Sequence, residues 1–267
     1  MQKNLIVIAP EGGLCNRMQA LDSAIALARK TGSELGVIWY RSANINSSFE
    51  DLFVVPAVVS RITEIDLYRW RGRARRRLYR KYFQTFFDLY LEHKQIPAEP
   101  AQLEDLAKGR RVLISAYRRF YEGPARYADL RPVPRLKAII DSRVSTIGRT
   151  IGVHVRRTDN RYARDHSPLE MFIDLMRREV AQDDASRFFV ATDSLEVEGR
   201  LRDEFPGRIC THEKRSLDRN DPLAIEDAVI DLYCLARCRK LIGSYWSSFS
   251  ETAWQLGGIE KTIVYRD

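Results

Sequence analysis

The stretch "IGVHVRRTDN", residues 151–160, places a cluster of strongly hydrophilic residues at the end of an apolar strand. Apolar side chains occupy every second position, at Ile151, Val153 and Val155. The two-residue period of a strand therefore puts His154 and Arg156 together on the other face. Charged groups inside a sheet need partners, because an unpaired buried charge costs several kcal/mol. We expect either a nearby carboxylate or a bound ligand to face these side chains.

The same strand opens a regular alternation of short apolar runs and helical stretches in the second half of the chain. This pattern predicts an α/β architecture with largely parallel sheets. The predicted strands are 150–155, 187–192, 208–212, 239–243 and 261–265. The predicted helices are 168–181, 195–204, 222–236 and 247–256.

The first half follows a similar plan. The predicted strands are 4–9, 34–40 and 110–117. A helix is predicted over 16–32, with Gly32 positioned to end it, and a short helical turn follows, capped by Ser48 with Asp51 three residues on. The long basic and aromatic stretch 61–110 is expected to be mainly helical.

A composition shift over residues 130–148 suggests a domain boundary. We predict two Rossmann-like halves that face each other across a cleft, residues 1–147 and 148–267. The first half would carry the basic stretch as a helical insertion.

Composition narrows the class of protein. The 267 residues are 45% hydrophobic and 30% charged, as in an ordinary soluble globule. No apolar run approaches the roughly 20 residues that span a bilayer, and "MQKNLIVIAP" predicts a first strand, not a signal peptide. The four cysteines form no CxxC pair and are expected to be reduced thiols. A cytoplasmic protein is expected.

The net charge of +8 is concentrated in "RWRGRARRRLYRK", residues 69–81, which has seven arginines and one lysine. Nucleic acid, a membrane surface and an acidic substrate would all suit such a run. The segment matches no RNA-binding module, so we expect no nucleic acid partner. Two interpretations remain: a solvated helix face, or peripheral contact with an anionic membrane or a lipid-linked acceptor.

Ligands of open parallel sheets gather beyond the carboxyl ends of the strands, and polar residues follow several predicted strands here. In "APEGGLCNRM", residues 9–18, the glycines Gly12 and Gly13 allow close backbone approach, and Asn16 and Arg17 open a helix whose N–H groups attract anions. The segment lacks the spacing of dinucleotide-binding and P-loop motifs. A plain tight turn is the alternative.

The adjacent Arg156 and Arg157 suit bidentate capture of phosphate or carboxylate oxygens, with Asp159 placed to orient one of them. An arginine–aspartate pair that merely locks the strand end is the alternative. In "FFVATDS", residues 188–194, Asp193 is placed either to accept from ribose or base groups or to cap the following helix, and capping is the favoured role.

Four serines follow the predicted strand 239–243, in "KLIGSYWSSFSETAW", residues 240–254. Hydroxyls and free N–H groups at a helix N-terminus form an anion cradle. Simple N-capping is the alternative, but it needs only one or two serines.

Four short segments together resemble one superfamily. "HVRRTD" (154–159) closely resembles the first peptide motif of the α1,6-fucosyltransferases, including the nodulation enzymes, and more loosely that of the α1,2- and protein O-fucosyltransferases. "ATDS" (191–194) and "IGSYWSSFSETAW" (242–254) resemble the second and third motifs. "GGLCNRMQAL" (12–21) is similar to the loop that opens the N-terminal domain of these enzymes.

The resemblance implies a GT-B fold that binds GDP-fucose mainly in the C-terminal half, with the acceptor on the N-terminal side. It assigns the diphosphate to Arg156, supported by Arg157 and Asp159; the guanosine to His154, Asp193 and Asp231; and the phosphate side to Ser247, Ser248 and Phe249. The loop residues Gly12, Gly13, Asn16 and Arg17 complete the implied donor site.

The implied reaction transfers L-fucose with inversion to a hydroxyl of a glycan or glycoconjugate. The chain contains no DxD sequence, so Arg156 and the serine helix are expected to stabilise the departing GDP without a metal or other cofactor. Glu11 is the preferred general base, ahead of Asp165 and Asp159.

One position departs from the α1,6 enzymes. They carry a glutamate where this chain has Arg164, which puts α1,6 linkage in doubt. Two other functions stay open: a GT-B transferase that uses another nucleotide sugar, and a non-enzymatic protein that binds anions or nucleic acid.

Overall fold

The computed structural model describes residues 4–266, except 70–72, 75–76, 78–84, 149, 158–160 and 219, and leaves out the side chain of residue 163. The chain divides into two compact units. Unit 1 comprises Met1–Val133 and Asp218–Ile225; unit 2 comprises Pro134–Leu217 and Glu226–Asp267. The first division falls within the stretch 130–148, and the helix Pro134–Ile147 belongs to unit 2, not to the first half.

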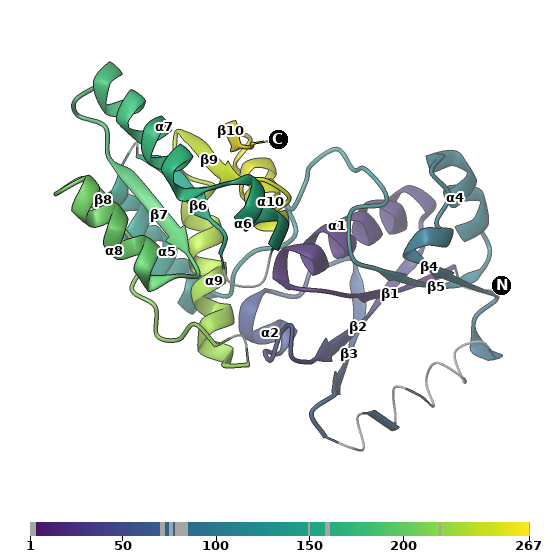
Figure 1. The fold of residues 1–267 in the computed structure, drawn as a ribbon. Helices are drawn as coiled ribbons and strands as arrows, with labels where there is room; N and C mark the ends of the chain where they lie inside the picture. The colour runs from purple at the N-terminus through teal and green to yellow at the C-terminus, as the bar shows by residue number, and fades with distance from the viewer. Residues whose placement is uncertain are drawn as a thin grey trace. The chain divides into compact units, whose positions relative to one another are not determined.

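Unit 1 is built on a five-stranded sheet of order β3-β2-β1-β5-β4, in which every paired neighbour is parallel. Its strands are β1 (Leu5–Pro10), β2 (Glu34–Arg41), β3 (Val59–Asp66), β4 (Leu89–Glu92) and β5 (Arg111–Ala116). Its helices are α1 (Leu14–Thr31), α2 (Phe49–Leu52), the 3₁₀ helix η1 (His93–Gln95) and α4 (Pro100–Ala107). Helix α1 packs against β1, β2 and α4 (Figure 1).

Two of these helices have the end signals that the sequence predicts. Helix α1 ends at Gly32, which adopts the left-handed conformation (φ 64°) and donates its N–H to the carbonyl of Ala28. Helix α2 begins with the capping box of Ser48 and Asp51. Both ends follow from the chemistry of backbone groups that a helix leaves unpaired.

The predicted helical character of residues 61–110 is wrong for much of its described part. Strands β3 and β4 lie there, and they form the two edges of the unit 1 sheet. Edge strands are half exposed, so their sequences carry charges that hide the two-residue period. In β3 only Val59 and Ile65 are buried.

Unit 2 is built on a second five-stranded parallel sheet, of order β10-β9-β6-β7-β8. Its strands are β6 (Ile151–Val155), β7 (Phe188–Thr192), β8 (Ile209–Cys210), β9 (Lys240–Ser244) and β10 (Glu260–Val264). Its helices are α5 (Pro134–Ile147), α6 (Arg161–His166), α7 (Leu169–Gln182), α8 (Leu195–Glu204) and α10 (Ser248–Gly257); α9 (Pro222–Leu235) begins in unit 1 and continues in unit 2. Helix α10 packs against β9, and α8 against β7 and α7 (Figure 1).

The predicted strands and helices of the second half match this unit closely. Strand β8 is shorter than predicted, and α5 and α6 were not expected as helices. In α5 the buried residues Leu136, Ile140 and Ile147 recur at helical spacing. Pro132 lies two residues before this helix, and Pro134 is its first residue. These two prolines obscured the helix, although proline at the first position suits a helix start.

The core of unit 2 is the apolar face of β6, β7 and β9 covered by α7 and α8. Val153, Phe172, Phe188 and Leu201 are among its fully buried members. The side chains of Ile151, Val153 and Val155 therefore all lie in this core, as their alternation in the sequence predicts. His154 and the residues that follow lie on the other face or beyond the strand end, where a site forms.

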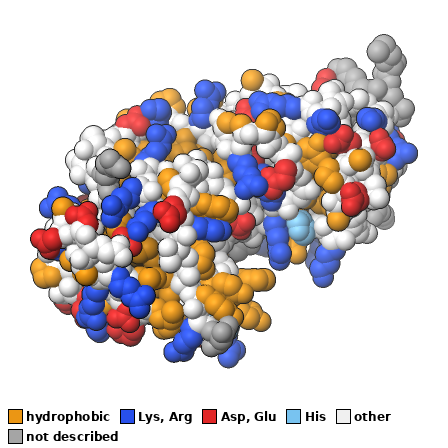
Figure 2. Space-filling model, turned by 90° about the horizontal axis from the view of Figure 1, so that it is seen from above, with side chains coloured by type: hydrophobic (Ala, Val, Ile, Leu, Met, Phe, Trp, Pro, Cys, Tyr) orange, Lys and Arg blue, Asp and Glu red, His pale blue; other side chains and the backbone are white. Residues whose placement is uncertain are grey.

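The surface of the molecule carries charges of both signs. On the face seen in Figure 2, lysine and arginine side chains lie interspersed with aspartate and glutamate. Within the described residues no helix is both long and apolar enough to cross a bilayer.

Candidate functional site

The candidate site lies at the carboxyl edge of the unit 2 sheet. Strand β6 is flanked by β7 and β9, and all three run parallel, so the segments that follow them are neighbours. These segments carry three of the four groups of polar residues that the sequence predicts. Ligands of open parallel sheets bind at such an edge.

Arg156 is held by both neighbouring strands. Its backbone N–H donates to the Ser244 hydroxyl at the end of β9 (2.9 Å), and its guanidinium Nη1 lies 3.3 Å from an Asp193 carboxylate oxygen. Its side chain is about one-fifth exposed. The guanidinium is therefore oriented by Asp193 and remains partly accessible to solvent.

Asp193 serves two arginines. Besides its ion pair with Arg156, it accepts the backbone N–H of Arg157 (2.8 Å). The favoured capping role of Asp193 is wrong, because Ser194 is the N-cap of α8 and accepts the N–H of Val197. Asp193 thus links the ends of β6 and β7. The proposed partner of Arg156 from the sequence, Asp159, lies outside the described residues.

One guanidinium nitrogen of Arg157 is left without an acceptor among the described residues. Its Nη2 is buried and has no hydrogen-bond partner within the described structure. Burial lowers the pKa of this guanidinium, Asp193 opposes that shift, and Arg164 adds to it. A buried cationic donor without an acceptor is costly. An anionic ligand at this edge would supply the acceptor.

The four serines divide into different roles. Ser244 accepts from Arg156 and donates to the carbonyl of His154 (3.2 Å), tying β9 to β6. Ser247 is the N-cap of α10 and accepts the N–H of Ser250. Ser250 is buried against His154. Ser248 is the first residue of α10, at the helix end that favours anions.

His154 is a neutral, buried hydrogen-bonding group. Its Nδ1 lies 2.7 Å from the Ser250 hydroxyl, and its ring stacks on Phe249 with centroids 4.7 Å apart. Burial lowers its pKa to about 3, with a further lowering from Arg156 and an opposing contribution from Asp193. The imidazole therefore positions α10 against β6 and carries no charge at neutral pH.

Asp231 lies in a separate charged cluster on α9. Its Oδ2 is bonded by the Lys214 ammonium, while its buried Oδ1 has no partner in the described structure. Burial raises the pKa of this carboxyl, and Lys214 opposes the shift. Sequence reasoning missed Lys214, because a lone lysine in a loop carries no signal. The implied guanosine role of Asp231 stays a prediction.

The glycine loop belongs to unit 1, between β1 and α1. Gly12 has φ 81°, and an added Cβ there would lie 2.9 Å from the Asn16 amide nitrogen. Gly13 precedes the first helical residue. The left-handed conformation and the close approach of Asn16 explain why the loop needs glycine at position 12.

Arg17 supports this loop from within. It is 2% exposed; its Nε donates to the Gly12 carbonyl, its Nη1 to Tyr40 and its Nη2 to Ser42. Burial lowers its pKa to about 10, with an opposing contribution from Glu11. The structure shows its donors engaged with protein atoms, so its contribution to a donor site would run through the loop.

The two described candidate bases have different surroundings. Glu11 follows β1 and accepts the Ser115 hydroxyl (3.0 Å), so one carboxylate oxygen is fixed beside β5. Asp165 lies on α6 in unit 2, 3.3 Å from Arg161 Nε and 3.6 Å from Arg164 Nε. Both carboxylates are within reach of solvent.

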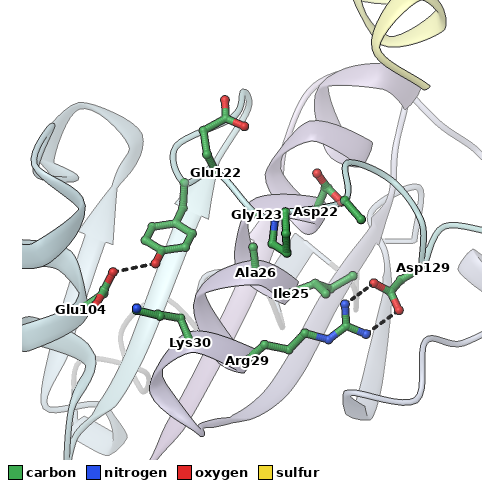
Figure 3. A pocket seen from close by; sticks show the side chains of 12 residues that line it. Asp22, Ile25, Ala26, Arg29, Lys30, Glu104, Glu122, Gly123 and Asp129 are labelled. Atoms are coloured by element: carbon green, nitrogen blue, oxygen red, sulfur yellow. Dashed lines mark hydrogen bonds and ion pairs between the residues drawn. The ribbon is translucent and has the colours of Figure 1, made fainter. Parts of the chain in front are cut away.

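Unit 1 also contains a pocket of about 450 Å³ between the second half of α1, α4 and the loop after β5. Its polar groups are largely paired: the Tyr121 hydroxyl donates to Glu104 (2.6 Å), and Arg29 makes two bonds to Asp129 (Figure 3). Burial, with Glu104, raises the pKa of Tyr121 to about 12. The first pair holds the loop on α4, and the second holds it on α1.

The described residues offer no ready set of ligands for a metal ion. Among the described residues no group of three or more histidine, cysteine, aspartate or glutamate side chains is placed to hold a metal ion. The chemistry on offer at the unit 2 edge is that of arginine, serine and a helix N-terminus.

Two parallel five-stranded sheets, each with its own helices, define the GT-B class of fold. The solved structures that share it include the NodZ α1,6-fucosyltransferase soaked with GDP-fucose, at 20% sequence identity and a TM-score of 0.65, covering 95% of this chain and 92% of that one. NodZ from Bradyrhizobium gives 19% identity and a TM-score of 0.63, covering 95% and 93%.

POFUT1 in complex with GDP matches at 13% identity and a TM-score of 0.59, covering 99% of both chains. No protein-family model and no curated protein sequence matches this chain. The chain therefore has the GT-B fold of the fucosyltransferases, as its sequence motifs predict.

Proposed function

We propose that the protein is a glycosyltransferase that moves L-fucose from GDP-fucose to a hydroxyl of a glycan or glycoconjugate. The observation that carries the proposal is the pair Arg156 and Arg157 at the carboxyl edge of unit 2, with a buried Arg157 nitrogen, Nη2, that has no hydrogen-bond partner among the described residues. Structures of the same fold contain GDP or GDP-fucose. Three of the four motif segments follow strands whose carboxyl ends form this edge, which supports the proposal.

The proposed chemistry is an inverting displacement. The acceptor hydroxyl loses its proton to a carboxylate, its oxygen forms the new bond to the anomeric carbon, and the bond from that carbon to the phosphate oxygen breaks. The electron pair leaves with GDP. Arg156, Arg157 and the N-terminus of α10 would stabilise the charge on the departing diphosphate, usually the largest contribution to catalysis, without a divalent metal.

The alternative transferase uses another nucleotide sugar, because an arginine–diphosphate contact does not recognise the sugar. A screen of nucleotides and nucleotide sugars by thermal shift, run in EDTA, separates the two. We expect GDP and GDP-fucose to stabilise the protein selectively; a ligand at 100 times its dissociation constant adds about 2.7 kcal/mol. An equal response to UDP-sugars would favour the alternative.

The matching variant is Arg156→Ala. It should lose GDP binding and transfer together, because a bidentate guanidinium contact to phosphate is lost, and Arg156→Lys should restore little. Arg177→Ala is the control: this exposed arginine of α7 pairs with Glu204, away from the site. Calorimetry with GDP provides the measurement. Normal GDP affinity in Arg156→Ala would refute the diphosphate assignment.

A further inference from the structure

Five aromatic rings of unit 2 form a connected cluster next to α10. They come from α6, from the loop between β9 and α10, and from the tail after β10. The members are Tyr162, His166, Tyr245, Trp246 and Tyr265. Neighbouring centroids lie 4.5 Å apart for Tyr245 and Tyr265 and 6.2 Å apart for Tyr162 and Trp246. The donor assignment uses none of these rings.

Two of the rings face solvent and are here called the aromatic platform: Trp246 is 62% exposed and Tyr162 is 64% exposed. Burying a large aromatic ring is favourable, so two adjacent exposed rings call for a binding explanation. Trp246 also has a positive φ of 52°, a conformation that costs a bulky residue energy.

The backbone around the platform is firmly held. The N–H of Tyr245 donates to the buried Ser167 hydroxyl (2.8 Å), which in turn donates to the Val264 carbonyl (2.7 Å). His166 Nδ1 lies 2.8 Å from the Arg266 carbonyl oxygen. These bonds tie the loop, α6 and the tail together, so the strained Trp246 backbone is imposed by its surroundings.

The platform borders the candidate donor site through the chain itself. Trp246 stands between Ser244, which binds the Arg156 backbone, and Ser247, the N-cap of α10. One residue therefore separates the exposed indole from the helix end proposed to receive phosphate. The remaining polar groups on α6 carry both signs of charge: Arg161, Arg164 and Asp165.

We propose that the aromatic platform is the acceptor subsite and stacks on the apolar face of a sugar ring. The inference rests on the proposed transferase function, which requires an acceptor hydroxyl close to the diphosphate-linked sugar. A pyranose offers C–H groups to an aromatic face and hydroxyls to flanking charges. The charged side chains of α6 can hydrogen-bond those hydroxyls, whereas two arginines partly neutralised by Asp165 give an anionic membrane little to bind.

The test measures glycan and GDP binding separately. GDP-loaded protein is applied to an array of neutral oligosaccharides that end in glucose, galactose, mannose or N-acetylglucosamine, and the best binder is then titrated by calorimetry. Trp246→Ala should bind that glycan at least about tenfold more weakly, as for a central aromatic contact, and Trp246→Phe should keep most of the affinity. GDP affinity should be unchanged in both.

Two further variants separate binding from folding. Leu195→Ala removes an apolar side chain of similar exposure (67%) from the same unit and should leave glycan binding unchanged. Trp246→Gly removes the backbone strain, so it should melt no lower than the wild type and yet lose glycan binding. A merely structural tryptophan would show the opposite, a lower melting temperature.

Each other outcome is decisive. Unchanged glycan binding by Trp246→Ala, or no glycan bound by a wild-type protein that binds GDP, overturns the platform and leaves the donor proposal standing. Weaker GDP binding by Trp246→Ala would mean that the indole stacks on the nucleotide, which also overturns it. Trp246-dependent glycan binding by a protein that does not bind GDP supports the platform and refutes the proposed donor.

Discussion

His154 shows how burial of one side chain sets its chemistry. Its ring lies between the Ser250 hydroxyl and Phe249, and its pKa is lowered to about 3. The sequence placed His154 beside Arg156 on one strand face but did not show that Ser250, the ninth residue of the segment 242–254, would bind it. That contact crosses from β6 to α10, and only the folded sheet brings these positions together.

This burial predicts a pH dependence of stability. Folded His154 stays neutral to about pH 3, whereas the unfolded chain takes up a proton below about 6.5. The unfolded state therefore binds more protons between these values, so stability is lost as pH falls below 6.5. At pH 5 the unfolding free energy should be about 2 kcal/mol lower than at pH 7 from this group alone.

Urea unfolding at the two pH values measures the effect. His154→Gln, which cannot titrate, should lose less stability between pH 7 and pH 5 than the wild type. His93→Gln is the control, since burial lowers the pKa of this partly exposed histidine as well and should give a smaller change. Equal losses in wild type and His154→Gln would contradict the assignment.

The general base is the residue-scale question that the proposal leaves to experiment. Glu11→Gln should reduce kcat by about 10²–10⁴ with unchanged GDP affinity, because a general base acts on the acceptor and not on the diphosphate. Asp165→Asn and Asp159→Asn, the other two candidates, should retain most activity. Steady-state rates with saturating GDP-fucose provide the measurement, and a deeper loss in either aspartate variant would reassign the base.

Single residues also mark where sequence reasoning reaches its limit. The pairing of polar residues with strand ends was predictable, because parallel strands bring their carboxyl ends to one edge. The hydrogen-bond and ion-pair partners of these polar residues were not predictable. Asp193 binds two arginines instead of capping α8, and the Arg17 guanidinium binds Tyr40 and Ser42 as well as Gly12 of its own loop. Side chains of equal chemistry choose partners by tertiary distance, which spacing along the chain does not encode.

At the scale of elements, the edge strands β3 and β4 of unit 1 were not predicted, whereas the edge strands β8 and β10 of unit 2 were. Strands β6, β7 and β9 are almost entirely buried and their sequences are apolar runs, whereas β3 and β4 carry charges and were taken for helix. Helix α10 is positioned by close packing on β9. An added Cβ at Gly243 would lie 2.8 Å from both Cβ and Oγ of Ser250.

Gly243→Ala should therefore disturb the site as well as the fold. The methyl group would push α10 from β9, costing about 1–3 kcal/mol of stability as for other overpacked sites. Because Ser250 also binds His154, the N-terminus of α10 should move and GDP affinity should fall. Gly199→Ala on α8 is the control, with open space at its Cβ, and should be neutral or slightly stabilising. Unfolding titrations and GDP calorimetry on both variants would reveal a tolerant α10 if the two behave alike.

At the scale of the whole molecule, the alternation predicted the two-sheet α/β plan and the resemblance of the motifs implied the GT-B class, but neither predicted the division of the chain. Residues 218–225 come from the second half of the chain but belong to unit 1, so both units are discontinuous in sequence. A composition shift marks one crossing between units. Composition does not reveal that the short segment 218–225 belongs to unit 1, since the first turn of α9 differs little in composition from the rest of that helix.

The charge of the molecule leads to the last prediction. Removing residues 69–81 would leave a neutral chain, and most of this segment lies outside the described residues. Eight basic side chains near an anionic surface contribute about 1 kcal/mol each, so the protein should sediment with anionic but not with neutral vesicles. Binding should weaken steeply with salt, because the screening length falls from about 10 Å at 0.1 M to about 3 Å at 1 M.

The variant that tests this segment changes Arg73, Arg75, Arg76 and Arg77 to glutamine. It should lose vesicle binding at low salt and keep its GDP affinity, since the segment lies outside the donor motifs. The control changes four exposed arginines of unit 2 to glutamine, Arg177, Arg178, Arg200 and Arg202, and removes the same charge. If both variants lose binding equally, only net charge acts. If wild-type protein does not sediment with anionic vesicles, the membrane interpretation is wrong and the run is a solvated surface.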